Sequence, residues 1–242
     1  MKPIFVKQFI DLTTLKVDDT EERVVNLCEN AIKNDVAAIC VYPNFVSVAK
    51  DSLAKSNIKV ASVAGCFPAA QSALKIKLAE VEYALECGAD EIDIVFPVGL
   101  FFENKLDKVY EELNAYRGIC KDKILKCILE TGALQKDEHI KNASKIAIEC
   151  GMDFLKTSTG KISPAATPDA SKIMINAIKD HYLKTKKMVG FKVAGGVSTY
   201  EEATVYINLI NNILDTNTNK KWLTPQYFRI GASRLLNNLN NL

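Results

Sequence analysis

The sequence has very little histidine and no close pair of cysteines. Of its 242 residues only His139 and His181 are histidine, and they are far apart in the chain. The seven cysteines are scattered, odd in number and nowhere at CxxC spacing. These patterns argue against a metal site, a zinc ribbon and a disulfide framework, and they favour a chain kept in the reducing cytoplasm.

Neither sign of charge dominates, and no apolar run is long. The 31 basic and 29 acidic residues give a formal net charge of +2 and are mixed along the chain. A groove for nucleic acid is therefore a poor expectation. No stretch approaches the roughly 18 apolar residues that a membrane span needs, and the opening MKPIFVKQFIDLTTLK does not read as a signal peptide. We expect neither nucleic acid nor a membrane as a partner.

Short apolar runs alternate with longer amphipathic segments along the chain. The predicted strands are residues 9–13, 37–42, 59–63, 91–96, 124–129, 154–157, 189–193 and 227–230. The predicted helices include residues 20–33, 72–87, 105–120, 137–150, 168–181 and 199–214. Such alternation builds right-handed βαβ units and a parallel sheet. Eight strands in this length fit an α/β fold of the closed (β/α)8 TIM barrel type, as a single domain over residues 1–242, better than an open doubly wound sheet.

Five charged residues, each in a different predicted strand, stand beside apolar neighbours. These residues are Asp11, Asp93, Lys126, Lys156 and Lys192. Inward-facing residues of a barrel alternate with residues that face the helices, so groups of one parity from several strands meet inside. Two carboxylates and three ammonium groups that converge there can offset one another's charge. We therefore predict a charged centre in the barrel, toward the C-terminal ends of the strands, where barrel enzymes place catalytic groups.

Taken alone, each of these residues also has an ordinary structural interpretation. A single lysine in a strand usually lies on a solvated face, and Asp93 by itself fits a structural ion pair as well as it fits catalysis. Cys40, in the second predicted strand, fits a small packing residue better than a nucleophile. The recurrence of charge in five apolar runs favours a shared site over separate coincidences.

Glycine-containing segments follow the last three predicted strands. They are STGK at residues 158–161, AGGV at 194–197 and GAS at 231–233. Glycine lets backbone N–H groups approach an anion closely, and a helix N-terminus adds its positive end. Barrels often hold phosphate in the loops after strands seven and eight. The segments therefore indicate a phosphate site, although Gly-Gly is also a common turn.

Seven phrases of the sequence occur together, in the same order, in one known family. They are DLTTL (11–15), AAICVYP (37–43), EIDIVFP (91–97), LKCILETG (125–132), DFLKTSTGK (153–161), GFKVAGGV (190–197) and RIGAS (229–233). With them the chain resembles the deoxyribose-phosphate aldolases, the class I (Schiff-base) aldolases of deoxynucleoside breakdown. The resemblance implies a barrel that reversibly cleaves 2-deoxy-D-ribose 5-phosphate into acetaldehyde and D-glyceraldehyde 3-phosphate, with no metal or other cofactor.

The resemblance also implies a role for each matching position. Lys156 would be the Schiff-base lysine, Lys192 its partner lysine and Asp93 the proton-relay aspartate. The implied substrate contacts are Asp11, Cys40, Lys126, Thr159 and Lys161, and the implied phosphate contacts are Gly160, Gly195, Gly196 and Ser233. The expected partners are small phosphosugar and aldehyde molecules, and a homodimer is the assembly to test.

Among the departures from the family pattern, two concern the proposed site. Arg234 stands where relatives carry a second serine, which leaves the phosphate contact there open. The chain has no tyrosine after Tyr227, which leaves proton transfer by a C-terminal tyrosine open.

A lysine in the sixth predicted strand is explained if the site needs an uncharged amine. Only a neutral amine attacks a carbonyl carbon, and burial and a second cation both lower the pKa of a lysine. We expect Lys192, on the next predicted strand, to be that cation for Lys156. Two alternatives stay open: another Schiff-base barrel, acting on a sugar bisphosphate or a ketose, and a catalytically silent phosphosugar-binding protein.

Overall fold

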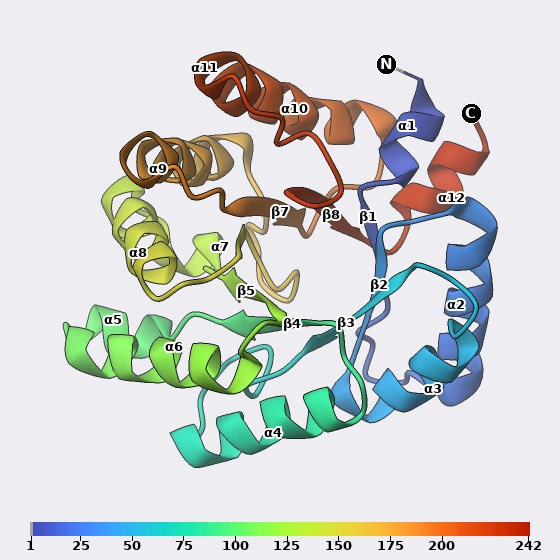
Figure 1. The fold of residues 1–242 in the computed structure, drawn as a ribbon, viewed down its shortest axis with the longest axis horizontal. Coiled ribbons are helices and arrows are strands. Elements are labelled where there is room, and N and C mark those ends of the chain that lie inside the picture. Colours follow the sequence, from blue (N-terminus) through green and yellow to red (C-terminus); the bar gives the residue numbers. More distant parts are fainter. Residues whose placement is uncertain (1) are drawn as a thin grey trace.

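The strands of the barrel pair in parallel with their neighbours in the chain, and the last strand pairs with the first. In the computed structural model, which describes residues 2–242, these strands are β1 (Ile10–Thr13), β2 (Ala38–Val41), β3 (Lys59–Val63), β4 (Glu91–Val95), β5 (Ile124–Ile128), β6 (Phe154–Lys156), β7 (Gly190–Ala194) and β8 (Phe228–Ala232). The closed order β1 to β8 confirms the predicted (β/α)8 barrel (Figure 1). The predicted ends of the strands differ from the observed ones by at most two residues.

Helices surround the barrel on its outside (Figure 1). The longer ones are α2 (Glu21–Asn34), α4 (Leu74–Glu86), α6 (Leu106–Cys120), α8 (Asp137–Glu149), α9 (Pro168–Thr185) and α10 (Tyr200–Ile210). The shorter ones are α1 (Pro3–Lys7), α3 (Val46–Ser52), α5 (Val98–Phe102), α7 (Thr131–Leu134), α11 (Thr216–Thr218) and α12 (Leu235–Asn240), with a 3-10 turn η1 (Pro43–Phe45) and a π-helical turn η2 (Asn211–Asp215). Within residues 2–242, none of these helices has both the length and the apolar character that a membrane crossing requires.

Threonine side chains begin three of the long helices. Thr20, Thr167 and Thr199 accept a backbone N–H from the first turn of α2, α9 and α10 respectively. Thr199 and Glu202 form a complete capping box, in which each side chain bonds the backbone of the other. Such caps satisfy N–H groups that a helix cannot pair internally, so they fix where the helix starts after its strand.

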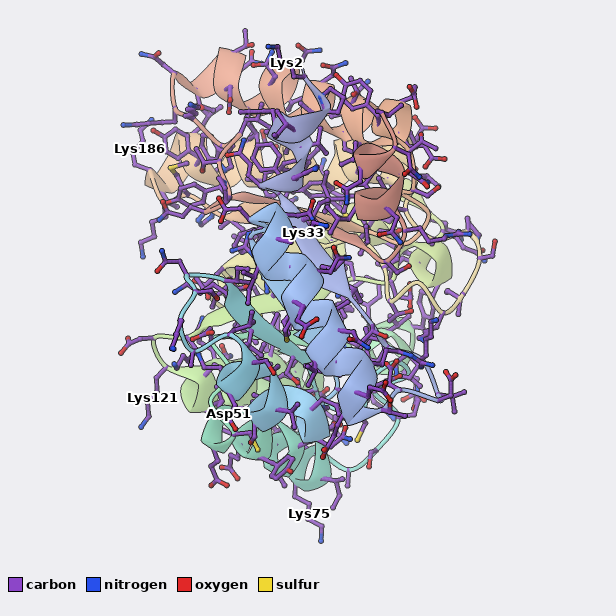
Figure 2. The ribbon with its side chains drawn as sticks, turned by 90° about the vertical axis from the view of Figure 1, so that its right-hand side faces the viewer. Lys2, Lys33, Asp51, Lys75, Lys121 and Lys186 are labelled. Carbon is purple, nitrogen blue, oxygen red and sulfur yellow. The ribbon has the colours of Figure 1, made fainter. Side chains whose placement is uncertain are left out.

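The two faces of the sheet are both buried, which is typical of a parallel barrel. Outward-facing strand residues such as Ile92 and Ile94 of β4 pack into the core beneath the helices. The outer surfaces of the helices carry the exposed charges, for example Lys33, Asp51 and Lys75 (Figure 2). The inward-facing residues of alternate parity are left to fill the barrel, and several of them are charged.

Candidate active site

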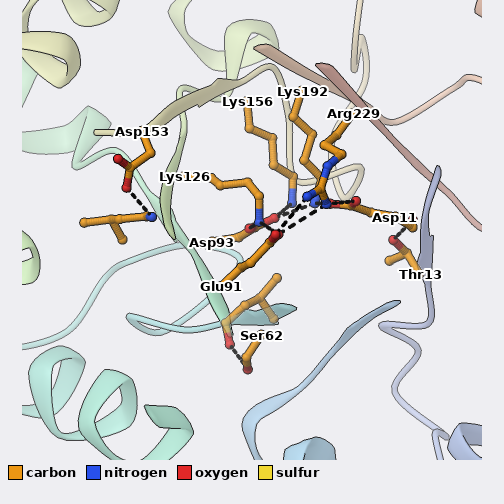
Figure 3. A network of polar contacts seen from close by, with 12 residues as sticks. Asp11, Thr13, Ser62, Glu91, Asp93, Lys126, Asp153, Lys156, Lys192 and Arg229 are labelled. Atoms are coloured by element: carbon orange, nitrogen blue, oxygen red, sulfur yellow. Dashed lines mark hydrogen bonds and ion pairs between the residues drawn. The ribbon is translucent and has the colours of Figure 1, made fainter. Parts of the chain in front are cut away.

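Six charged side chains inside the barrel form a closed ring of ion pairs (Figure 3). The members of this charged ring, in order, are Asp11 (β1), Arg229 (β8), Glu91 (β4), Lys126 (β5), Asp93 (β4) and Lys192 (β7). Carboxylates and cations alternate around it, and every member is buried. The ring therefore contains three formal negative and three formal positive charges, which cancel.

Asp93 occupies the side of the charged ring toward the C-terminal ends of the strands. Lys126 Nζ lies 2.7 Å from Asp93 Oδ1 and 2.6 Å from Glu91 Oε2. Lys192 Nζ lies 2.8 Å from Asp93 Oδ2 and 2.5 Å from Asp11 Oδ2. Each lysine thus bridges two carboxylates, which compensates for much of the cost of taking its charge out of water.

Arg229 closes the charged ring on the opposite side. Its Nη1 lies 2.7 Å from Asp11 Oδ1, and its Nη2 lies 2.9 Å from Glu91 Oε1. The planar guanidinium suits this position because it presents donors toward two carboxylates at once.

The register of the strands explains why these side chains meet. Asp93 is paired with Lys126 across β4 and β5, and Lys192 is paired with Arg229 across β7 and β8. Paired residues of neighbouring parallel strands face the same side of the sheet, which here is the inside of the barrel.

Lys156 is joined to the charged ring at a single point. Its Nζ lies 2.7 Å from Asp93 Oδ2, the same oxygen that contacts Lys192. Lys156 is also the register partner of Lys192 across β6 and β7. Because the ring is already neutral, a protonated Lys156 would add a positive charge that no further carboxylate of the ring offsets.

The pKa values follow from this arrangement. Burial lowers the pKa of Lys156, the Asp93 carboxylate opposes that effect, and the Lys192 cation adds to it. Burial also works against charge on Lys192, but the carboxylates of Asp11 and Asp93 outweigh it and raise the pKa. Burial disfavours a charged Asp93 as well, yet the neighbouring ammonium groups, Lys126 first, hold its pKa well below the ordinary value. Lys156 is therefore the amine of this centre that gives up its proton most readily.

A cleft of about 300 Å³ opens over Lys156 at the C-terminal ends of the strands. Its walls come from the loops after β1, β6, β7 and β8, and Lys156 lines it, whereas the charged ring lies beneath. The Lys161 ammonium group crosses between two of these loops and donates to the backbone oxygen of Leu15.

The predicted phosphate-type loops meet in this cleft. Its lining includes all of the residues predicted on them: Thr159, Gly160, Lys161, Gly195, Gly196 and Ser233. Gly195 has a φ of +86°, and a Cβ there would lie 2.7 Å from Ala165 Cβ and 3.2 Å from Gly160 Cα. Only glycine permits this close approach of the two loops without strain.

Residues 5–208 of the chain match the family model described as DeoC, the DeoC/LacD family of aldolases. The chain belongs to this family. This confirms the resemblance found in the sequence, and it makes the protein an aldolase, a carbon–carbon lyase.

Three solved structures show how widely the aldolase fold is shared. A Coccidioides immitis protein, provisionally assigned as a deoxyribose-phosphate aldolase, is 27% identical, with a TM-score of 0.85 over 100% of this chain and 87% of that one. QR15, an aldolase, is 28% identical, with a TM-score of 0.82 over 98% of this chain and 95% of that one. The deoxyribose phosphate aldolase of Aeropyrum pernix, which is tetrameric, is 25% identical, with a TM-score of 0.81 over 99% of this chain and 92% of that one.

Three predicted substrate contacts of the aldolase do not line the cleft. Asp11 and Lys126 belong to the charged ring beneath it. Cys40 packs with Leu15, Ala61 and Val63, and burial raises the pKa of its thiol. The structure therefore supports the packing interpretation of Cys40.

Sequence reasoning missed two members of the charged ring, Glu91 and Arg229. Glu91 lies two residues before Asp93, and Arg229 lies two residues before Gly231, which lines the cleft. The two-residue period of inward-facing strand positions was the signal that identifies both.

Glu130 is a further buried residue of this aldolase that the sequence did not single out. Its carboxylate accepts hydrogen bonds from the hydroxyl and the backbone N–H of Thr159, in the loop after β6. Burial raises the pKa of Glu130, and the bonds from Thr159 oppose that shift. The contact ties the end of β5 to a wall of the cleft.

Proposed function

We propose that this aldolase reversibly cleaves 2-deoxy-D-ribose 5-phosphate into acetaldehyde and D-glyceraldehyde 3-phosphate through a Schiff base on Lys156, in the breakdown of deoxyribose phosphate. One observation carries the proposal. A buried amine, joined to a charge-balanced ring, opens into a cleft whose charged lining residues are all basic.

The lining of the cleft suits a phosphorylated substrate. Besides Lys156 its charged residues are Lys16, Lys161 and Arg234, and within residues 2–242 no carboxylate lines it. The glycine-rich turns after β6 and β7 add backbone N–H groups, which approach an anion closely. Arg234, the residue that departs from the family pattern, supplies charge on the same wall as Ser233.

The reaction begins when the neutral Nζ of Lys156 attacks the aldehyde carbon C1 of the open-chain sugar. Loss of water gives an iminium ion, which accepts the electron pair of the C2–C3 bond as that bond breaks. The C3 hydroxyl gives up its proton to a base, for which a water held by Asp93 and Lys192 is our proposal, and glyceraldehyde 3-phosphate leaves. The remaining enamine is protonated at C2, and water hydrolyses the imine to acetaldehyde and free Lys156.

Borohydride trapping tests this function. With 2-deoxyribose 5-phosphate present, borohydride is expected to inactivate the enzyme irreversibly and to add a reduced adduct to Lys156, located by mass spectrometry of peptides. Lys156→Leu is expected to lower acetaldehyde release more than a thousandfold, since the nucleophile is lost. Lys33→Met, at an exposed position of α2, is the matched control and is expected to retain full activity.

Other outcomes would favour the competing functions. Activity that survives borohydride, or a Lys156→Leu rate within tenfold of the original, would contradict the Schiff base. Turnover of fructose 1,6-bisphosphate would indicate another Schiff-base barrel, and binding of deoxyribose 5-phosphate without trapping would indicate a silent binding protein.

A further inference from the structure

We propose that Glu91 and Arg229 are positioning residues that set the charge on Lys156 through the charged ring. This inference rests on the proposed function, because it concerns the residue that would form the Schiff base. Neither the resemblance to deoxyribose-phosphate aldolases nor the similar solved structures assign a role to either residue.

Glu91 and Arg229 lie at the opposite end of the barrel from the cleft. Glu91 is the first residue of β4, and Arg229 is the second residue of β8, so both are near the N-terminal ends of their strands. They line a separate cavity of about 520 Å³ at that end and do not line the cleft over Lys156. They are only 3% and 6% exposed respectively. A substrate in the cleft would not touch them, so any effect on the reaction passes through other side chains.

One route from this end to Lys156 runs through Lys126. The Lys126 ammonium group lies 2.6 Å from Glu91 Oε2 and 2.7 Å from Asp93 Oδ1. The other oxygen of Asp93 lies 2.7 Å from Lys156 Nζ. The Glu91 carboxylate is therefore separated from Lys156 by two directly contacting side chains.

The second route runs through Asp11. Its two oxygens contact Arg229 Nη1 at 2.7 Å and Lys192 Nζ at 2.5 Å. Lys192 then contacts Asp93 Oδ2, the oxygen that Lys156 shares. Both routes converge on Asp93, so a change of charge at Glu91 or at Arg229 acts on the Asp93 carboxylate.

The effect of each residue has a definite sign. With Glu91 neutralised the ring carries an excess positive charge, and a proton on Lys156 becomes less favourable. With Arg229 neutralised the ring carries an excess negative charge, and the proton becomes more favourable. Removing both charges restores a neutral ring.

Other titratable groups act on Lys156 but stay constant when Glu91 and Arg229 are varied. Cys40 of β2 and Glu130 after β5 interact with it electrostatically, and burial raises the pKa of each. The remaining charged residues of the cleft lining are Lys16, Lys161 and Arg234. None of these pairs with Glu91 or Arg229 within residues 2–242.

The test measures the protonation of Lys156 directly and compares four variants. The rate at which acetic anhydride acetylates Lys156 is measured against pH by mass spectrometry, and kcat/KM for 2-deoxyribose 5-phosphate is measured against pH in parallel. We expect Glu91→Gln to move both acid limbs to lower pH by about 1 unit and Arg229→Gln to move them up by about 1 unit. The double variant and the charge-conserving Arg229→Lys are expected to stay near the original profile.

Opposite shifts are the result that a merely structural role does not produce. Shifts of the same sign, or unmoved limbs in folded variants, would overturn the proposal. The pH shift expected for each single variant has a definite sign. One folded single variant is therefore enough to test whether the ring controls the charge on Lys156. If both singles fail to fold while the double variant folds, the pair is structural and the proposal is wrong.

Failure of the proposed function is distinguishable from failure of this inference. An original enzyme that neither cleaves the substrate nor forms a borohydride adduct would contradict the Schiff base on Lys156. The acetylation profiles would still report whether Glu91 and Arg229 control the charge of that lysine.

Discussion

At Lys156 the stability of the fold and the proposed reaction make opposite demands on one amine. A buried ammonium group needs a counter-charge, yet the oxygen of Asp93 that it contacts is shared with Lys192. The surroundings therefore lower its pKa, with burial as the largest cause. Such a lowered pKa favours nucleophilic attack and reduces the stability of the fold at neutral pH.

Replacing this lysine is expected to stabilise the protein. Because the pKa of Lys156 is lower in the folded chain than the 10.5 of an ordinary lysine, the unfolded chain binds more protons between the two values. Stability therefore rises with pH across that window. Lys156→Met should raise the free energy of unfolding at pH 7 by about 1 kcal/mol, and the difference should shrink toward pH 10.5, as measured by urea unfolding.

Lys33→Met serves again as the exposed control and should change stability by less than about 0.5 kcal/mol. A Lys156→Met protein that is less stable than the original at pH 7 would show that the amine stabilises the fold and is charged there.

At the scale of elements, the cleft depends on two loops that touch. The loops after β6 and β7 approach through Gly160 and Gly195, and Glu130 holds the first of them from the end of β5. Gly132 in α7 adds a second close approach, since a Cβ there would lie 2.0 Å from the backbone oxygen of Pro164. The walls of the cleft are thus positioned by contacts between loops as well as by the strands.

Gly195→Ala tests this contact. Its Cβ would lie 2.7 Å from Ala165 Cβ, so the two loops must separate, and KM for 2-deoxyribose 5-phosphate, the proposed substrate, should rise about tenfold or more. Gly88→Ala is the matched control, because Gly88 also has a positive φ, of +98°, but its new Cβ would meet only the flexible Lys50 side chain at 3.4 Å.

Both substitutions should cost about 1 kcal/mol of stability through backbone strain. Steady-state kinetics should distinguish the two variants, since only Gly195→Ala is expected to raise KM. An equal KM in the two variants would mean that the approach of the loops does not shape the site.

The strands and the long helices could be predicted from the sequence, whereas short helices such as α1 and α7 could not. Strand β3 and helix α8 were placed within one residue because apolar periodicity extends over their whole length. Helices α1 and α7 have 5 and 4 residues, which is too few for a helical period to show.

The same limit applies to the site. Lys156, Lys192 and Asp93 were predicted because their charges interrupt apolar runs. Glu91 was missed because it follows Asp90 at the start of its strand, where a charge is unremarkable in sequence, and Arg229 was missed although it stands between Phe228 and Ile230. Their partnership depends on barrel closure, which brings β8 beside β1 and its arginine opposite a carboxylate of β4.

At the scale of the whole molecule, the charged ring makes stability depend on acid pH. The pKa values of Asp11 and Asp93 are lowered by neighbouring cations despite the opposing effect of burial. Since the unfolded value is 3.8, these carboxylates stabilise the fold above that pH and lose their contribution as the pH falls below it. The ring joins β1, β4, β5, β7 and β8, so the loss weakens the barrel as a unit.

We expect the free energy of unfolding to fall steeply below about pH 3.8. Asp93→Asn should reduce the slope of the free energy of unfolding against pH by up to one proton, about 1.4 kcal/mol per pH unit. Denaturant titrations followed by circular dichroism measure this slope. Asp51→Asn, at an exposed position of α3, should leave the slope unchanged. Identical slopes for the original protein and Asp93→Asn would contradict a lowered pKa of Asp93 in the folded protein.

Because neutrality of the charged ring is a sum over five strands, no single member is free to change alone during evolution. A lineage that loses the arginine of β8 must also lose an acid elsewhere in the ring, or the proposed nucleophile, Lys156, becomes protonated and activity falls. Comparison of relatives should therefore reveal correlated exchanges between positions 91 and 229, although these residues lie 138 positions apart in the chain.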